Sequence, residues 1–562
     1  MRSYSNDAEF EFPKHIVFNV DNLNKLIEKH HFTSLGFDQK RSRKSTGDLT
    51  MSSTESLAME ETEKSNSLQP IERLNVDGFL RMVGGFGKFQ IILDIVCCII
   101  MCPFTFHVLI MYFAALQPEW KCVENSTVCL LNGTFTSEND FRCQIPRSEW
   151  EYMKPREYSI VTEFDIYCDR DWMIYMTTSI LFIGWMFGAI FIGWLADNYG
   201  RRKTMLLSIV MVLTASLIAP FVNNIYVFII FRFIVGFFIP GGGVIMFVLI
   251  SEIVNDKYRP LAGIILWVFF TLILCVMGLL AYLIPKWKIL FIICTAPFFA
   301  TLPLFKFIPE SVRWLRLKGK IEEALEIFQR IADWNGRKLN PNASLSMVQG
   351  VEHSSNPLDL FKTKRMAIKT LIQGFAWMVN GMVYYGISLA SDDLGGSLYL
   401  NYVLVSLIEL PAHVFAIDFS NRFGRRKTTS ISMILAGILT LVVAFIPKSH
   451  NEFRVMFGML GKMLITVSFD VIYTWSVEIY PTNIRSEAMG FLQITSRIGA
   501  ASAPWIAKAV KVIHNTLPFL IMGVLGLLAG IACSILPETK GQETQETEND
   551  VTEEVFFMDE FK

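Results

Sequence analysis

The sequence predicts an all-α membrane protein with about twelve transmembrane helices, arranged as two six-helix halves. Apolar runs of roughly 20 residues recur along the chain, and each is long enough to cross a hydrocarbon core about 30 Å thick. Three short motifs also occur twice, in the same order and displaced by almost the same distance. A duplicated half within a membrane protein is typical of transporters.

The repeated motifs lie between apolar runs or directly after them. The first contains Gly-Arg-Arg-Lys, which begins at Gly200 and again at Gly424. The second places an acid and an arginine at identical spacing, and its copies are Glu252-Ile253…Arg259 and Glu478-Ile479…Arg485. The third occurs as Pro309-Glu310-Ser311 and as Pro537-Glu538-Thr539.

The expected spans lie near residues 89–116, 172–195, 204–222, 225–250, 260–284, 287–308, 369–390, 397–419, 429–446, 453–476, 486–507 and 516–536. They divide the chain into a tail (1–75), an N-terminal half (76–308), a linker (309–368), a C-terminal half (369–540) and an acidic tail (541–562).

Charge predicts the orientation of these spans. The links that carry the Gly-Arg-Arg-Lys motifs are strongly basic and fall on one side if twelve spans alternate. Because basic links stay in the cytoplasm, we expect both termini to be cytoplasmic. Lys286, Lys288 and Lys448 lie on the other side and are exceptions.

The composition argues against several classes of function. The 51 Lys and Arg balance the 52 Asp and Glu, so no basic excess indicates a nucleic-acid partner. No nucleophile, metal cluster or cofactor motif stands out, so we expect neither an enzyme nor a cofactor. The Pro240-Gly241-Gly242-Gly243 run has no following Lys-Ser/Thr and lies inside a span, so it indicates close helix packing or a kink.

Both polar segments at the predicted cytoplasmic face have structural interpretations. Residues 1–75 are polar and Ser-rich, which is typical of a disordered tail. In the linker, apolar residues recur at helical spacing between acids, as in Ile321, Ala324, Leu325 and Phe328. This pattern predicts an amphipathic helix that lies under the bundle or on the membrane face.

A long loop, 117–171, separates the first two spans and is expected outside the cell. It contains four cysteines, Cys122, Cys129, Cys143 and Cys168, and two glycosylation acceptors, Asn125 and Asn132. An even set of cysteines in an extracellular loop predicts a disulfide-stapled, glycosylated cap. Four cysteines allow three pairings, and the sequence does not choose among them.

The first two motifs combine acids with bases in both halves, which predicts a gating role. Ion pairs at the rim of two rocking halves can hold one state closed and release in the other. The simpler alternative is a positively charged anchor on the cytoplasmic side. The predicted gating residues are Asp197, Gly200, Arg201, Arg202, Glu252, Arg259, Asp418, Gly424, Arg425, Arg426, Glu478 and Arg485.

These motifs resemble those of the major facilitator superfamily. The long Cys-rich loop, which ends Phe164-Asp165-Ile166-Tyr167-Cys168-Asp169, is similar to that of its organic cation, organic anion and carnitine transporter family, known as solute carrier family 22. Val83-Gly84-Gly85-Phe86-Gly87 and Glu409-Leu410-Pro411-Ala412 also resemble that family, over roughly residues 76–540. Val312 departs from it, because the family usually has Pro there. The resemblance implies a plasma-membrane transporter of organic ions.

Ionisable residues inside spans are the first candidates for substrate binding, since they are costly there and usually face a cavity. Arg497 resembles the arginine of the anion and carnitine members, and its planar fork matches a carboxylate. Glu409 resembles an acid shared by cation and carnitine members. His413 lies one helical turn further, where some anion members have lysine. An internal ion pair for Arg497 and a core-packed neutral His413 are the structural alternatives.

Aromatic residues at helical spacing are the second group of candidates. Ring faces attract organic cations and pack against flat organic anions. Simple packing against lipid or core is the alternative for each of them. The candidates are Trp377, Tyr384, Tyr385, Phe469 and Tyr473. Lys462 and Asp470, two turns apart in one span, are interpreted instead as members of internal salt bridges.

Together these residues suggest a carnitine-like zwitterion or an organic anion as the substrate, moved by alternating access. Arg497 would bind the carboxylate, and Glu409 with the aromatic rings would bind the cationic end. An organic cation transporter is the main alternative, and a sugar porter or a membrane sensor that moves nothing follows. The lipid bilayer is an implied partner, and coupling to Na⁺ or H⁺ is left open, with Asp94, His107 and Asp470 as titratable candidates.

Overall fold

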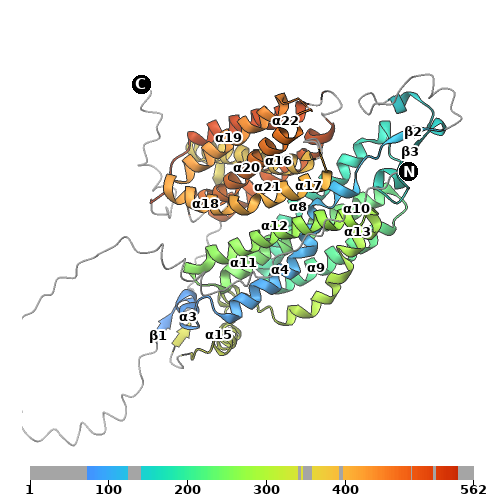
Figure 1. Ribbon diagram of the computed structural model, residues 1–562. Helices are drawn as coiled ribbons and strands as arrows, with labels where there is room; N and C mark the ends of the chain where they lie inside the picture. Colours follow the sequence, from blue (N-terminus) through green and yellow to red (C-terminus); the bar gives the residue numbers. More distant parts are fainter. Residues whose placement is uncertain are drawn as a thin grey trace, which may run out of the picture. The chain divides into compact units, whose positions relative to one another are not determined.

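The structure is a computed structural model that describes residues 72–123, 141–339, 343–345, 357–391, 396–447, 449–481, 484–509, 514 and 516–541. Within these residues the protein is helical apart from two short strand pairs, and the long helices form two bundles (Figure 1). Most of the predicted tails, together with Asn125, Cys129 and Asn132, lie outside the described residues.

The N-terminal half contains most of its predicted spans as helices, some of them broken into two pieces. Its long elements are α4 (Lys88–Leu109), α5 (Met111–Ala114), α8 (Trp172–Tyr199), α9 (Arg201–Ile218), α10 (Ile225–Gly242), α11 (Val244–Ile253), α12 (Arg259–Leu283), α13 (Trp287–Ile293) and the 3₁₀ segment η6 (Ala296–Lys306). The break between α10 and α11 falls in the predicted glycine run. A Cβ on Gly241 would lie 2.1 Å from Ser208 Oγ of α9, which explains the small residue by close packing.

The C-terminal half has the same character. Its elements are α16 (Lys364–Leu389), α17 (Leu398–Leu407), α18 (Glu409–Phe423), α19 (Arg425–Phe445), α20 (Asn451–Ile479), α21 (Arg485–Pro504), the π-helical segment η9 (Trp505–Ala509) and α22 (Leu517–Ser534). α17 and α18 together fill one predicted span.

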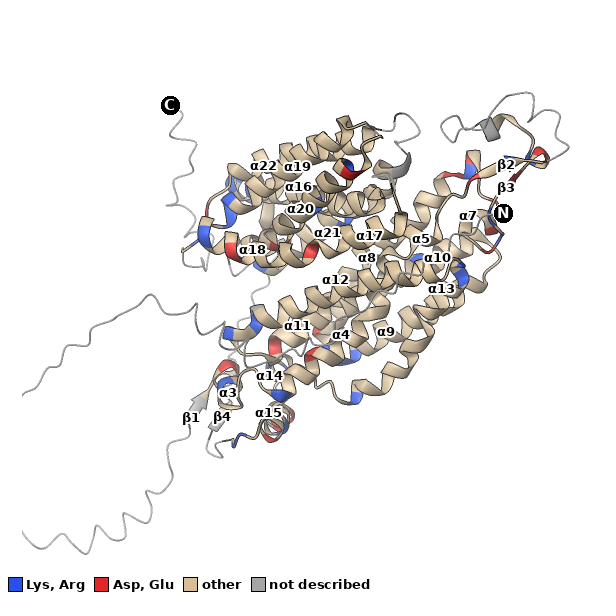
Figure 2. Ribbon diagram, in the orientation of Figure 1, with Lys and Arg blue, Asp and Glu red and all other residues tan. Residues whose placement is uncertain are grey.

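Ten helical segments among the described residues are long and apolar enough to cross a bilayer. α16 and α21 are not among the ten, so the count of twelve stays a prediction. Both helices are rich in polar side chains, and they bury many of them, including Lys369, Gln373 and Asn380 in α16 and Arg497 in α21. In the other helices most charged residues lie near the helix ends, as expected for membrane spans (Figure 2), and Arg232 in α10 and Lys462 in α20 are among the exceptions.

Two helices of the linker pack beneath the N-terminal half. α14 (Val312–Leu317) and α15 (Ile321–Asn335) follow η6, and α3 (Val76–Met82) lies against α15 through stacked Phe79 and Phe328 rings. The strand β1 (Glu72–Leu74) pairs in parallel with β4 (Ala343–Leu345). The apolar face of α15 is buried against the rest of the protein, which agrees with a helix that lies under the bundle.

The side chain of Asn335, at the end of α15, fixes this linker to the first span. Its Oδ1 accepts a hydrogen bond from the Phe89 backbone N–H at 3.0 Å, and its Nδ2 donates to the Val83 carbonyl at 2.9 Å. Asn335 therefore caps the N-terminus of α4 from a distant part of the chain.

The loop between α5 and α8 contains the other strand pair. β2 (Trp120–Cys122) pairs antiparallel with β3 (Trp150–Tyr152), and the short helix α7 (Ile160–Glu163) follows. We call the end of the bundle that bears this loop the loop end. The end that bears the two Gly-Arg-Arg-Lys motifs is the motif end.

Two helices of the N-terminal half, α8 and α12, pack on helices of the C-terminal half. α8 packs on α21, and α12 packs on α17 and α18. At the loop end, Ser391 Oγ donates to Tyr112 Oη at 2.8 Å, and the Phe113 ring stacks on Tyr399 with centroids 5.7 Å apart. Aromatic side chains therefore join the halves at that end.

Candidate functional site

The five predicted aromatic residues form one continuous cluster inside the C-terminal half. Trp377, Tyr384 and Tyr385 come from α16, and Phe469 and Tyr473 come from α20. Trp377 lies 4.3 Å from Tyr473 and 6.0 Å from Phe469, measured between ring centroids. Tyr384 stacks on Phe469 at 5.8 Å. The cluster reaches the other half, because Phe182 of α8 lies 4.6 Å from Tyr385.

Glu409, at the start of α18, is buried, and both of its carboxylate oxygens have partners. Its Oε1 lies 3.2 Å from Lys462 Nζ of α20. Its Oε2 accepts hydrogen bonds from Tyr384 Oη at 3.0 Å and from Thr271 Oγ1 of α12 at 3.4 Å. Glu409 therefore lies at the edge of the aromatic cluster, with its charge balanced by Lys462.

Lys462 is completely buried, and all three of its N–H donors have acceptors. Besides Glu409, it donates to Ser388 Oγ at 2.8 Å and to the Tyr384 carbonyl at 3.0 Å. Its ammonium also lies 3.0 Å from the Tyr384 ring centroid. The predicted internal pairing of Lys462 is thus present, with Glu409 as the partner.

A second acid–base pair joins the same two helices. His413 Nδ1 lies 2.6 Å from Asp470 Oδ2. The His413 side chain is 6 % exposed, and its Nε2 has no hydrogen-bond partner among the described residues. The Trp267 ring of α12 packs against the imidazole, with ring centroids 6.4 Å apart. The pair lies where the two halves meet.

Arg497, in the middle of α21, has a different environment. Its guanidinium lies 3.7 Å over the Trp185 ring of α8, and the Tyr385 hydroxyl lies beside it. It donates to Gln493 Oε1 at 3.4 Å, and Gln493 Nε2 donates to Tyr473 Oη at 2.9 Å. Among the described residues no ion pair holds this buried arginine, which is 6 % exposed.

The charges around the cluster are therefore unequal. Glu409 is balanced by Lys462, and Asp470 is paired with His413, whereas the charge of Arg497 rests on an aromatic face and an amide. A buried guanidinium without a carboxylate is a strong receptor for one, because it forms charge-assisted bidentate hydrogen bonds.

At the motif end of the N-terminal half, the first and third repeated motifs meet at one carboxylate. Glu310 Oε1 accepts hydrogen bonds from the backbone N–H groups of Arg201 at 2.7 Å and Arg202 at 3.1 Å. The carboxylate therefore caps α9, whose N-terminus carries partial positive charge. Gly200 has φ +106°, and a Cβ there would lie 2.3 Å from Glu310 Oε2, so only glycine fits.

The Arg201 side chain completes this network. It lies 2.7 Å from Asp197 Oδ1 and 3.6 Å from Glu252 Oε2. Trp314 Nε1 donates to the Asp197 carbonyl at 2.8 Å. The predicted pairing of Arg201 with Asp197 and Glu252 is thus present within one half.

The C-terminal half repeats the arrangement. Glu538 Oε1 accepts from the Arg425 backbone N–H at 2.7 Å, and Gly424 has φ +91°. Arg425 Nε lies 3.0 Å from Glu478 Oε2, and Arg422 pairs with Asp418 at 2.8 Å. The Arg426 guanidinium donates to the Leu536 carbonyl at 3.4 Å.

Two predicted gating arginines have other partners than the sequence suggests. Arg259 pairs with Asp77 of α3, which also pairs with Arg313 at 2.6 Å. Arg485 donates to the Tyr480 carbonyl at 3.3 Å. The acids of the second motif therefore pair with the arginines of the first.

The loop contains a disulfide between Cys143 and Cys168, and Cys122 is disulfide-bonded as well. Two of the three lysines that were exceptions to the charge rule pair with acids of this loop, and the third, Lys448, lies outside the described residues. Lys286 lies 2.5 Å from Glu157, and its hydrogen bond and charge hold the pKa of Glu157 below its usual value. Lys288 lies 3.2 Å from Glu163.

Sequence reasoning missed the residues that face the cluster from the N-terminal half, namely Phe182, Trp185 and Thr271. They lie in ordinary apolar spans, and nothing in their spacing distinguishes them. It also missed Arg232 of α10, a 1 % exposed arginine that donates to the carbonyls of His107 and Thr177 at 3.1 and 3.3 Å. An arginine inside an apolar run was a visible signal for it.

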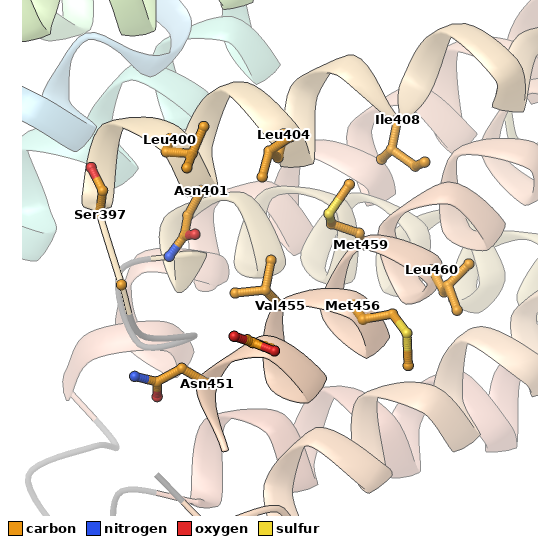
Figure 3. Close-up of a pocket in the computed structure, with 12 residues that line it drawn as sticks. Ser397, Leu400, Asn401, Leu404, Ile408, Asn451, Val455, Met456, Met459 and Leu460 are labelled. Atoms are coloured by element: carbon orange, nitrogen blue, oxygen red, sulfur yellow. The ribbon is translucent and has the colours of Figure 1, made fainter. Parts of the chain in front are cut away.

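A groove of about 460 Å³ lies elsewhere, between α17 and α20 (Figure 3). Its lining is mostly apolar, with Leu400, Leu404, Met456 and Met459 on its walls, and Asn401 and Asn451 toward one end. None of the candidate site residues lines it.

The known proteins that the chain resembles are transporters. Residues 96–551 match the family described as "Sugar (and other) transporter". The chain is 36 % identical over 405 residues to solute carrier family 22 member 3 of Rattus norvegicus, which covers 72 % of this chain and 73 % of the relative. It is 30 % identical over 519 residues to the organic cation transporter protein of Drosophila melanogaster, covering 85 % and 94 %.

A solved structure shows the same fold. The inward open conformation of the xylose transporter XylE from E. coli matches with a TM-score of 0.58 and 16 % identity, covering 82 % of this chain and 99 % of that one. At this identity the likeness concerns the fold and not the substrate.

Proposed function

Because the chain belongs to solute carrier family 22, within the major facilitator superfamily, we infer that it carries small organic ions across a membrane by alternating access. Proteins of this fold and family are transporters rather than enzymes. The candidate site, built from both halves around the aromatic cluster, is where such an ion would bind.

The unbalanced charge of Arg497 supports a carboxylate as the recognised group. Glu409 is paired with Lys462, and Asp470 is hydrogen-bonded to His413 rather than to Arg497, so a substrate carboxylate is the direct partner that the guanidinium lacks. The Trp185 face holds the guanidinium in place before the substrate arrives. Preorganisation of this kind reduces the entropy lost on binding.

The aromatic cluster supports a substrate with a second, cationic or flat end. A carnitine-like zwitterion would place its carboxylate on Arg497 and its ammonium group on the ring faces of Tyr384, Tyr385 and Tyr473. Glu409 would contribute at longer range, since Lys462 lies against it. A flat aromatic carboxylate would stack on the same rings.

Uptake into cells that express the chain tests this proposal. Radiolabelled carnitine, tetraethylammonium and hippurate, an aromatic carboxylate, are compared in parallel, with surface protein measured by biotinylation. We expect saturable uptake of carnitine or hippurate, and a loss of about 100-fold in Arg497→Ala, because a buried charge-assisted pair contributes about 3 kcal/mol. Arg497→Lys, which keeps the charge without the fork, should retain part of the uptake. Full uptake by Arg497→Ala would refute the carboxylate assignment.

The alternative is an organic cation transporter in which Arg497 only supports the fold. The similarity to an organic cation transporter protein of Drosophila favours it. It predicts uptake of tetraethylammonium alone, which Glu409→Gln abolishes. Arg497 variants would then lose surface protein rather than affinity. A sensor would bind carnitine or hippurate but show no counterflow.

We also propose a plasma-membrane location with both termini in the cytoplasm. Disulfides persist in oxidising surroundings, and the Cys143–Cys168 bridge lies at the opposite end from the basic motifs. An epitope inserted in the loop should be labelled on intact cells, and one at either terminus only after permeabilisation. Coupling to Na⁺ or H⁺ would supply the driving force, and replacing Na⁺ or collapsing a pH gradient distinguishes the two.

A further inference from the structure

Two acid–base pairs connect α18 to α20, and they differ in how completely their polar atoms are satisfied. In the Glu409–Lys462 pair, both carboxylate oxygens and the ammonium have partners. In the His413–Asp470 pair, His413 Nε2 is buried and has no partner among the described residues. The second pair therefore keeps an open position for a proton.

The His413–Asp470 pair is placed where a change of charge would affect both halves. His413 lies against Trp267 of α12, a helix of the N-terminal half that packs on α18. The Asp470 side chain is 23 % exposed, whereas the His413 imidazole is almost completely buried. Ionisable groups placed in this way inside spans usually serve transport.

Imidazole is the side chain that ordinarily gains or loses a proton between pH 5 and 8. The charged groups that act on His413 are Asp470 of α20 and Glu409 of its own helix, while α12 presents the neutral Trp267. Lys462 balances Glu409. A neutral His413 thus leaves the charge of Asp470 uncompensated, and a protonated His413 cancels it.

The charges of the site then add up in a way that links proton and substrate. With Arg497 positive and Asp470 negative, the empty site with neutral His413 has no net charge. A bound carboxylate alone makes it negative, and a bound proton alone makes it positive. The site is neutral again when both are bound. Uncompensated charge is costly in a membrane interior, so the two singly loaded states are disfavoured.

We propose that the His413–Asp470 pair binds a proton that is transported together with a monoanionic carboxylate held by Arg497. The proposal rests on the proposed function and adds the coupling ion, its site and its dependence on substrate charge. The proton adds to His413 on one side of the membrane and leaves it on the other, and no other bond changes. A zwitterion brings no net charge, so its transport needs no proton.

Purified full-length protein in liposomes, with the pH dye pyranine inside, tests the coupling. At an internal pH of 7.5, we expect hippurate uptake to be clearly faster at external pH 5.5 than at 7.5, because the lower pH favours protonation of the His413 imidazole. Hippurate entry should acidify the interior, after subtraction of the signal from protein-free liposomes. Carnitine uptake should change less than twofold between the two pH values.

His413→Gln should remove the pH ratio for hippurate. The matched control is His107→Gln, which alters another buried histidine, in α4, whose ring is hydrogen-bonded to Thr295. This variant should keep the pH ratio. Asp470→Asn is the second variant and should also flatten the ratio. An unchanged ratio in reconstituted His413→Gln or Asp470→Asn would overturn the proposal.

Measurements on the wild-type protein alone can also overturn it. The coupling proposal would be overturned by saturable hippurate uptake that does not acidify the liposome interior. It would also be overturned if carnitine uptake had the same pH ratio as hippurate uptake. Either result would leave the proposed function intact. Saturable uptake of neither substrate at either pH would overturn the proposed function and the coupling together.

Discussion

Replacement of Lys462 and Glu409, singly and together, would measure how the buried pair is held. The side chains are 0 % and 2 % exposed, with Nζ and Oε1 3.2 Å apart. Breaking a buried pair by removing one partner costs about 3–5 kcal/mol, because a charge is left uncompensated. We expect Lys462→Met to destabilise the protein by about 3 kcal/mol, at the low end of this range, because Tyr384 and Thr271 still donate hydrogen bonds to Glu409.

Glu409→Gln should cost a similar amount, because the ammonium of Lys462 keeps Ser388 and the Tyr384 carbonyl but loses its counter-charge. The double variant removes both charges and should cost about 1–2 kcal/mol, so the coupling energy is about 4 kcal/mol. An exposed pair, Lys320 with Glu323 at 2.6 Å, is the control, and Lys320→Met should change stability by less than about 0.5 kcal/mol.

Thermal inactivation rates in detergent, measured at one temperature without substrate, report these differences, because large membrane proteins unfold irreversibly. Both single variants should inactivate much faster than the wild type, and the double variant should lie closer to the wild type than either. A double variant as unstable as the sum of the two singles would refute the pairing.

Three further predictions concern the ends of the bundle. Gly200→Ala should destabilise the protein by about 2 kcal/mol or more, since φ is positive and Glu310 occupies the space of a Cβ; Gly193→Ala, which meets nothing within 4 Å, is the control in the same inactivation assay. Replacing both Cys143 and Cys168 by Ser should cost about 3–4 kcal/mol, from the entropy of the loop that the bond closes, and should expose the loop to proteolysis. Asp77→Asn should cost about 1–2 kcal/mol by weakening the contacts to Arg259 and Arg313, and it should make Arg313→Gln nearly neutral in the same background.

The sequence was most informative where one physical rule acts along the chain. Apolar runs placed most spans, and Gly200 and Gly424 marked turns that need positive φ. The predicted spans 369–390 and 486–507 coincide with α16 and α21, yet these two helices are not among the ten that are long and apolar enough to cross a bilayer, because they bury polar residues such as Gln373 and Arg497. The two helices that give the weakest membrane signal therefore carry half of the candidate site residues.

Pairing between distant segments was harder to predict. The sequence showed that Glu310 belongs to a repeated motif, but its role as the cap of α9 depends on packing between segments 109 residues apart. It likewise presented Lys462 and Arg497 as ionisable residues in spans. Which of the two is balanced by Glu409 follows only from the way α16, α18 and α20 pack.

The capping of α9 by Glu310 and of α19 by Glu538 has a mechanical consequence. Each cap joins segments of a single half, so the far end of each half is stiffened without being tied to its neighbour. The aromatic contacts of Tyr112 and Phe113 with Tyr402 and Tyr399 lie at the other end and can serve as the fulcrum. We therefore expect the two halves to move as rigid bodies about these aromatic contacts, with both helix caps intact throughout.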